Sequence, residues 1–370
     1  MLVRVPDYFD QFQCLAGACP HTCCEKWEVV IDEESAAFYR TVPGDLGDKL
    51  RAALQVDGDG DVCFPLDGGR CPFLDEDNLC EIHRKLGEAA TSVTCREHPR
   101  FTEDYGPFRE ITLSASCPAA NTLLLGSEAP LTFRTFETEE PAEDGDEWLT
   151  YLLPLRRRML DLLTDRSRPL RARLASFLAL ALAAQDCLDD DCPEELPEVE
   201  PAAPHPAEEG LFPRALSLLA SLEVLDPDWP ALLKQAETAE PGTAPEELLE
   251  RVAVYFAFRY LLKAVNDGDL LGRAELCVLA VLVIERLAAV CEGLPSRPSE
   301  TVVMGRGDAR KQREGAPKGG SDRSGLCVDE ALRRFSCEIE HDDGNLEALL
   351  EAFAQESTLS PERFLAELGQ

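Results

Sequence analysis

Eight cysteines in the first third of the chain form one ordered series. Thiolate is a soft ligand that suits zinc and iron–sulfur clusters. Four cysteines complete one such site, so eight are enough for two. The chain starts without a recognisable secretory signal, which favours metal ligation over disulfide pairing. The expected ligands are Cys14, Cys19, Cys23, Cys24, Cys71, Cys80, Cys95 and Cys117.

The adjacent pair Cys23 and Cys24 limits how these thiols are shared. Neighbouring side chains in an extended segment point to opposite faces. We therefore expect that the two do not serve the same metal, and that one belongs to a second ligand set or is a packed thiol. Spacing alone favours structural zinc and an iron cluster equally. Buried thiols that bind no metal are a third interpretation.

Residues beside the cysteines suit a ligand site. Pro72 and Pro118 follow cysteines directly and help to bend the backbone, whose N–H groups can donate to thiolate sulfur. Arg96 and Arg100 can offset the charge of several thiolates. Seven further cysteines lie outside the pattern: Cys63, Cys187, Cys192, Cys277, Cys291, Cys327 and Cys337.

The elements that must position these residues are mainly helical. We expect a mainly α fold in which an irregular, cysteine-rich α+β domain over residues 1–133 holds a metal site. An acidic linker over 134–147 leads to a helical domain over 148–370, with flexible segments at 186–210 and 295–325. A length of 370 residues and 45% hydrophobic content suit a globular chain of two or three domains.

Local patterns predict individual elements. Alternation predicts strands over 27–32 and 108–113. Apolar periodicity predicts helices over 33–39, 148–165, 169–184, 243–262 and 272–290, with two more at the end of the chain. The helix from Thr243 begins with a capping box, and the last helix is capped by Ser360, Pro361 and Glu362.

Charge and hydropathy narrow the class of protein. A net charge of −34 argues against nucleic-acid binding, which needs clustered Lys and Arg, and is compatible with a basic protein partner. No apolar run approaches the ~18 residues that span a bilayer. We expect a cytoplasmic protein that binds neither nucleic acid nor membrane.

The motifs resemble those of known families. The segments that begin at Cys71, Cys80 and Cys95, preceded by the Cys-Cys pair, resemble the CxxCxxCC family of zinc- or iron-chelating domains. A longer resemblance is to flagellin lysine-N-methylases. It includes Cys14 to Asp32, Cys71-Pro-Phe-Leu-Asp75, His98-Pro99-Arg100, Leu113-Ser-x-Ser-Cys117-Pro118, Tyr255-Phe-Ala-Phe-Arg259-Tyr260 and Phe335-Ser336-x-Glu338-Ile339-Glu340-His341.

This resemblance implies an activity and its cofactors. It implies transfer of a methyl group from S-adenosylmethionine to lysine side chains of flagellin, with a [4Fe-4S] cluster as cofactor and zinc as the alternative. No glycine-rich strand–turn–helix marks a Rossmann-type site. Arg96, Arg100 and Arg259 are the expected cofactor-binding residues. The competing functions are a non-catalytic zinc- or iron-binding protein and a redox enzyme.

Glu338, Glu340 and His341 are the candidate catalytic residues. A lysine must be neutral to attack a methyl group, so Glu338 or His341 is a candidate base, and the carboxylates are candidate binders of the incoming lysine. The competing reading is a solvated acidic helix start. Tyr255, Arg259 and Asp267 are weaker candidates. Tyr255 and Arg259 lie one turn apart on an apolar helix, a pattern that is more typical of packing at the edge of the core.

Overall fold

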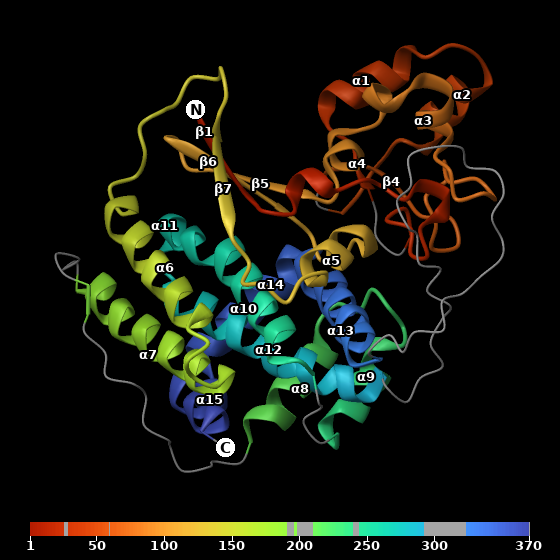
Figure 1. Ribbon diagram of the computed structural model, residues 1–370. Helices are drawn as coiled ribbons and strands as arrows, with labels where there is room; N and C mark the ends of the chain where they lie inside the picture. The colour runs from red at the N-terminus through yellow and green to blue at the C-terminus, as the bar shows by residue number, and fades with distance from the viewer. Residues whose placement is uncertain are drawn as a thin grey trace.

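A computed structural model describes residues 1–25, 29–58, 60–190, 196–197, 210–239, 244–291 and 323–369. Three predicted features fall partly or wholly outside these ranges: the start of the strand at 27–32, the capping Thr243 and most of the segments 186–210 and 295–325. Cys192 also lies outside them. Figure 1 shows a helical body, a sheet over one end of it and a small lobe that carries α1 to α4.

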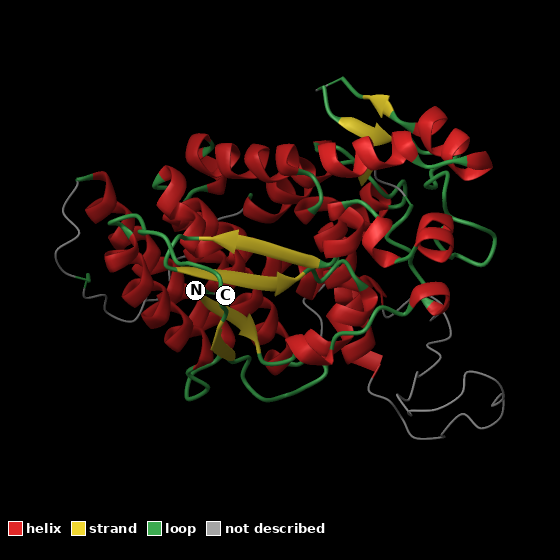
Figure 2. Cartoon of the chain, turned by 90° about the horizontal axis from the view of Figure 1, so that it is seen from above, coloured by secondary structure: helices red, strands yellow, loops and turns green. Residues whose placement is uncertain are grey.

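The larger sheet has the strand order β5-β6-β1-β7. Its strands are β1 (Leu2–Pro6), β5 (Arg100–Asp104), β6 (Phe108–Leu113) and β7 (Phe133–Glu137). β1 runs parallel to β6 and antiparallel to β7, and β5 and β6 form an antiparallel pair. Figure 2 shows these strands side by side against the helices. β6 confirms the predicted strand, whereas β7 occupies the first residues of the segment expected to be a linker.

The small lobe lies between β1 and β5 in sequence. Its helices are α1 (Glu33–Thr41), α2 (Gly44–Ala53), α3 (Glu81–Leu86) and α4 (Val93–Glu97), and its strands are β2 (Val29–Val30), β3 (Gln55–Val56) and β4 (Val62–Phe64). α1 confirms the predicted helix, and its N-cap Asp32 accepts a hydrogen bond from the Ser35 amide at 2.9 Å. Tyr39, Phe64 and Phe73 pack in an apolar core separate from that of the helical body.

The helical body follows the predicted pattern closely. Its helices are α5 (Pro118–Leu125), α6 (Leu149–Thr164), α7 (Leu170–Asp189), α8 (Leu211–Ser221), α9 (Trp229–Glu237), α10 (Glu246–Tyr260), α11 (Ala264–Asp267), α12 (Leu270–Cys291), α13 (Arg323–Glu340), α14 (Asp343–Gln355) and α15 (Pro361–Leu368). A mainly α fold is therefore confirmed. None of the described helices is long and apolar enough to cross a lipid bilayer.

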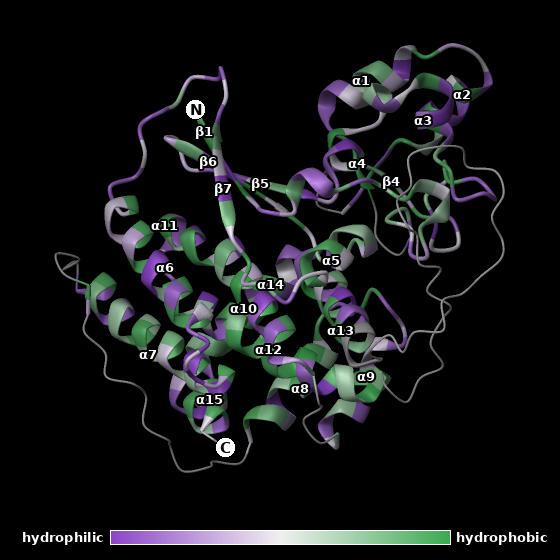
Figure 3. Cartoon of the chain, in the orientation of Figure 1, coloured by the Kyte–Doolittle hydropathy of each residue, from purple (hydrophilic) through white to green (hydrophobic). Residues whose placement is uncertain are grey.

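α12 is the centre of this body. It contacts α7, α9, α10 and α13, and apolar side chains on every side of it, such as Leu276 and Ile284, are completely buried. A helix that is apolar all round is typically enclosed by other helices. Figure 3 shows hydrophobic colour along much of α10 and α12 in the interior of the helical body.

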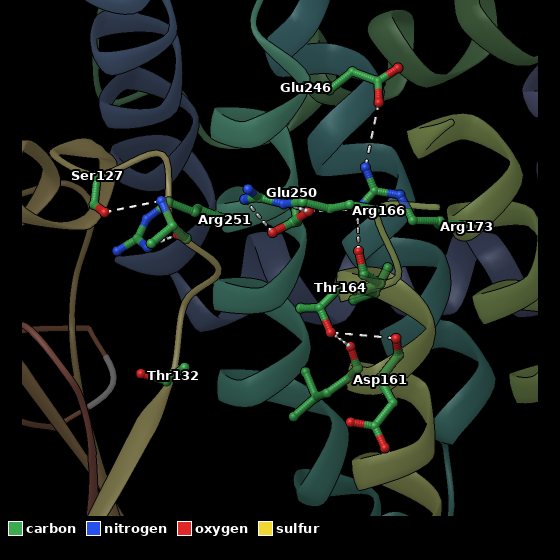
Figure 4. Close-up of polar contacts among 12 residues, drawn as sticks. Ser127, Thr132, Asp161, Thr164, Arg166, Arg173, Glu246, Glu250 and Arg251 are labelled. Atoms are coloured by element: carbon green, nitrogen blue, oxygen red, sulfur yellow. Dashed lines mark hydrogen bonds and ion pairs between the residues drawn. The ribbon is translucent and has the colours of Figure 1, made fainter. Parts of the chain in front are cut away.

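Buried ion pairs connect the helices around this core. The Glu250 carboxylate on α10 is fully buried and accepts hydrogen bonds from Arg166 at 2.9 Å and from Arg173 at 2.6 Å. Figure 4 shows both guanidinium groups meeting at Glu250, with the neighbouring Arg251 directed toward the opposite side. Glu110 on β6 is likewise buried, and its two carboxylate oxygens are 2.7 and 2.6 Å from Arg156 on α6, which connects the sheet to the helices.

Candidate functional site

Four of the expected ligands belong to the small lobe. The Cys71 amide donates to the Cys24 carbonyl at 2.8 Å, and Cys24, Cys71 and Cys80 contact the apolar core of the lobe. Burial, with added effects of charge on Cys24, Cys71 and Cys80, raises the pKa of the Cys95 thiol to about 12. These four thiols therefore act on one another electrostatically.

The other four thiols interact in the same way. Burial raises the pKa of Cys117 to about 11, with added effects from Cys19 and Cys14. Cys14 and Cys117 also act on Cys23. None of the eight expected ligands is in a disulfide. Cys24 acts on both Cys95 and Cys19, so the thiols around Cys95 and those around Cys117 are connected through it.

Cys23 and Cys24 are joined by a hydrogen bond between their sulfur atoms. This bond favours a thiol at Cys23 and a thiolate at Cys24, so it raises the pKa of Cys23 far above its usual range and lowers that of Cys24 to about 7. Cys24 is therefore the thiol of the pair that is ready to act as a ligand, because the thiolate is the metal-binding form.

The donors suit zinc or iron–sulfur chemistry, but their positions do not form a finished site. Among the residues that the structure describes, no three His, Cys, Asp or Glu side chains are arranged to hold a metal ion. Metal ligation requires distances of about 2.0–2.3 Å from each donor. We therefore assign no chemical step to a metal, and the ligand set remains a prediction.

Arg96 and Arg100, expected near the cofactor, have other neighbours. Arg96 donates to the Thr91 carbonyl at 2.7 Å. The Arg100 guanidinium lies 5.3 Å from the ring centre of Phe12 and 6.0 Å from that of Phe9. Arg96 thus stabilises the turn before its own helix, and Arg100 lies near two aromatic rings of the N-terminal segment.

A buried polar cluster forms around Glu340, at the end of α13. Its carboxylate is fully enclosed and accepts hydrogen bonds from Tyr255 at 2.9 Å and Tyr260 at 3.1 Å. Arg259 Nε lies 2.9 Å from the same carboxylate. Burial, and then the charge of Glu340, raises the pKa of Tyr255 well above its ordinary value, so this hydroxyl remains a donor.

Arg259 connects this cluster to the sheet. It donates to Thr112 Oγ1 on β6 at 3.1 Å, and its guanidinium lies 3.6 Å from the ring centre of Phe101 on β5. The Tyr255 hydroxyl also accepts a hydrogen bond from the Ala115 amide at 3.2 Å. α10 is therefore fixed both to the end of α13 and to the segment that leads into Cys117.

The reading of residues 338–343 as a solvated acidic helix start holds for Asp342 and Asp343 and is wrong for Glu338 and Glu340. Glu338 and Glu340 lie in the last turn of α13 and are 2% and 6% exposed. Glu338 accepts hydrogen bonds from the amides of Leu225 and Asp226 at 2.9 and 2.8 Å. Its carboxylate therefore anchors the loop between α8 and α9. The next helix begins at Asp343, after the N-cap Asp342.

His341 lies just beyond Glu340 and is only partly buried. Its Nε2 is 2.6 Å from the Ser116 hydroxyl, which is 2.8 Å from the Ser114 hydroxyl. Burial, and then the charge of Arg259, lowers the pKa of His341 to about 4. The imidazole is therefore neutral at pH 7. The ring of His98, from the cysteine-rich segment, lies 5.7 Å away.

Segments that are far apart in the sequence thus meet at one place. Cys117 follows Ser116, Ser116 contacts His341, and Glu340 contacts Arg259. The weaker candidate Asp267 lies elsewhere, paired with Arg273 at 2.7 Å at the start of α12. Sequence reasoning gave no role to Ser114, Ser116 or Tyr260, although each lies inside a motif; Thr112 and Phe101 carried no local signal.

Comparison with known proteins identifies relatives that act in flagellar biology or on lysine. Lysine-N-methylase of Salmonella choleraesuis strain SC-B67 is 26% identical over 239 residues, which cover 59% of this chain and 57% of that protein. Lysine-N-methylase of Salmonella typhimurium strain LT2 is 26% identical over 233 residues with the same coverage. The chain thus spans less than two thirds of the length of these two relatives.

The flagellar biosynthetic protein FliU of Salmonella muenchen is 30% identical over 131 residues, which cover 33% of this chain and 76% of FliU. The chain therefore belongs to the family that contains FliU. No family model matches the chain. No solved structure matches it either.

Proposed function

We propose that this protein is a lysine N-methyltransferase that moves a methyl group from S-adenosylmethionine to lysine side chains of a protein, with flagellin as the substrate. Relatives named lysine-N-methylase and the flagellar protein FliU support this class of activity. The structural observation that carries it is the meeting of the Cys117, Arg259 and Glu340 segments, because the residues of the resemblance are brought together from distant parts of the chain.

The transfer requires a base, and His341 is the residue that we assign to this role. The ε-ammonium group of lysine must lose a proton before its nitrogen attacks the methyl carbon. The C–S bond of the sulfonium then breaks, its electron pair stays on sulfur, and the thioether leaves. His341 is partly exposed, and its neutral ring passes the proton on to solvent, because a pKa of about 4 prevents the ring from keeping it at pH 7.

Glu340 has a positioning role in this proposal. Its carboxylate is enclosed by Tyr255, Tyr260 and Arg259, so it does not face a substrate. It fixes the end of α13 from which His341 projects. Glu338 is similarly committed to the backbone of the loop after α8 and has no part in the transfer.

The cysteine thiols extend the proposal to a cofactor. We keep a [4Fe-4S] cluster as the expected group, with zinc as the alternative, on the strength of the soft donor set and of the pKa of about 7 at Cys24. When bound, such a cluster would hold its cysteine ligands in fixed positions and contribute to folding of the lobe.

The activity is tested with S-adenosylmethionine that carries a deuterated methyl group. Anaerobically reconstituted protein is incubated with flagellin, and lysine modification is measured by mass spectrometry. We expect deuterated methyl groups on flagellin lysines. Unmodified flagellin, in a preparation whose iron and sulfide have been quantified, would contradict the proposed activity.

A further inference from the structure

A pocket with a volume of about 520 Å³ opens between the start of α12, the end of α14 and the start of α15. This volume lies in the range of small-molecule sites, about 300–1,000 Å³. Its walls include no residue of the cysteine-rich lobe and none of the Glu340 cluster. It is therefore a separate feature of the helical body.

Glu275, on α12, lines this pocket and is only 2% exposed. Its Oε1 atom has no hydrogen-bond partner among the residues that the structure describes. Buried polar atoms are nearly always hydrogen-bonded, and an unpaired one costs about 1–3 kcal/mol. A buried carboxyl oxygen without a partner at the wall of a pocket indicates that a ligand supplies the missing contact.

The other acidic groups near Glu275 are already engaged. Asp269 accepts a hydrogen bond from the Gly272 amide at 2.8 Å and lies 3.6 Å from Arg273. Glu356 is paired with Arg214. Glu275 is thus the carboxyl group of the pocket that has capacity left for a ligand.

The charges around Glu275 favour a cation. Burial, and then the negative charges of Asp269 and Glu362, raises the pKa of Glu275 to about 9. Arg273 is the positive group beside Asp269. An incoming cation would compensate both the burial of the Glu275 carboxylate and the repulsion from its acidic neighbours.

The walls also contain apolar side chains. Leu271 and Leu350 line the pocket together with Phe353. A coordinated metal does not suit these surroundings, and the structure, over the residues it describes, holds no group of three ligands that could bind one. A cation with a hydrocarbon stem matches both the carboxyl group and the apolar walls.

We propose that this pocket binds a primary alkylammonium group, with the ammonium head on Glu275 and the hydrocarbon stem against Leu271, Leu350 and Phe353. The chemistry is that of an aliphatic amine, supplied either by a lysine side chain of a protein or by a small free amine. This proposal is independent of methyl transfer, because its evidence comes from the pocket alone.

The test uses calorimetric titration of the full chain at pH 8 with n-butylammonium, with Nα-acetyl-lysine methylamide and with spermidine. We expect saturable binding to the wild type and a loss of at least about tenfold in affinity in Glu275→Gln, since removing one partner of a buried charged contact is costly. The matched control Glu347→Gln removes an exposed carboxylate on α14 outside the pocket and should bind like the wild type.

A second measurement covers the case in which Glu275→Gln fails to fold. Titrations of the wild type in buffers of different ionisation enthalpy report protons released on binding, and we expect release near pH 8 as Glu275 ionises. Binding without proton release, equal binding by Glu275→Gln, or no binding of any of the three amines would overturn the pocket assignment. Preference for the capped lysine identifies a protein side chain as the source, and preference for spermidine identifies a free amine.

The methyl-transfer assay is read separately. Amine binding with no methylation would contradict the proposed function and leave the pocket assignment standing. Methylation without amine binding at Glu275 would support the proposed function and contradict the pocket assignment.

Discussion

At the scale of single residues, hydrogen bonding decides which charged groups are structural. Glu340 and Glu338 have their oxygen atoms occupied, whereas His341 retains a neutral ring and Glu275 has an oxygen without a partner. The run of charge at residues 338–343 conceals this difference, because the partners Tyr255 and Arg259 come from another helix. Burial of Glu340 could not be predicted from its local sequence.

Tyr255→Phe tests the Glu340 cluster. It removes a donor to a buried carboxylate and the acceptor of the Ala115 amide. We expect a loss of about 1.5–3 kcal/mol in the free energy of unfolding, measured by urea denaturation. Tyr105→Phe is the matched control, since the buried Tyr105 hydroxyl has no hydrogen-bond partner and its removal should cost little. Equal losses in both variants would contradict the cluster's role.

Glu275→Gln has a predicted pH signature. The pKa of Glu275 is about 9 in the folded chain and near 4.5 when unfolded. Between these values folding takes up a proton, so the contribution of Glu275 to stability falls as pH rises. We expect the variant to gain stability relative to the wild type progressively from pH 5 to pH 9, measured by urea denaturation at each pH. A difference that does not change with pH would show that Glu275 ionises normally.

At the scale of elements, periodic helices were predictable and long-range strands were not. The ranges of α6, α7 and α12 differ from the predicted ones by a few residues, because each carries its own apolar pattern. β1 and β7 were missed, since they are short and their partners lie more than a hundred residues away, as in the pairing of Leu2 with Phe108 and Glu137. Tertiary pairing, which local sequence does not encode, decides such strands.

Arg156→Ala tests how the sheet is joined to the helices. Arg156 is buried and makes two hydrogen bonds to Glu110 on β6 and one to the Phe258 carbonyl at 3.1 Å. Its loss leaves Glu110 buried, with the partly exposed Arg4 as its remaining ion-pair partner in the described part of the chain. We expect a cost of about 3–5 kcal/mol in unfolding free energy. Arg157→Ala, which removes the exposed neighbour on α6, should cost far less; similar losses would contradict this interpretation.

At the scale of the whole molecule, the chain has two apolar cores of unequal size. The larger spans the helices and the four-stranded sheet, whereas the smaller lies in the cysteine-rich lobe. Small cores are often supplemented by metal ligation, which then contributes folding free energy. The series of cysteines predicts a ligand site, and four of its members lie in this lobe, but which thiols bind depends on positions that spacing does not determine.

Iron content tests that prediction. We expect anaerobically reconstituted wild type to carry iron and sulfide, and Cys24→Ser or Cys95→Ser to carry less and to melt at a lower temperature, because each removes a thiol from one electrostatic group. Cys277→Ser is the control for metal content, which should equal that of the wild type, because this thiol is buried in α12 within the larger core. A colourless protein with stoichiometric zinc would contradict the cluster, and unchanged metal in both ligand variants would contradict the choice of thiols.

The most direct test of the account compares flagellin methylation rates of the wild type and His341→Gln under single-turnover conditions with S-adenosylmethionine. Glutamine keeps a polar contact to Ser116 and cannot accept the lysine proton. We predict methylated lysines with the wild type and a rate about 10²–10⁴-fold lower in the variant, with the same melting temperature. No methylation by the wild type, or an equal rate in a folded variant, would contradict transfer at the place where the His341, Ser116 and Cys117 segments meet.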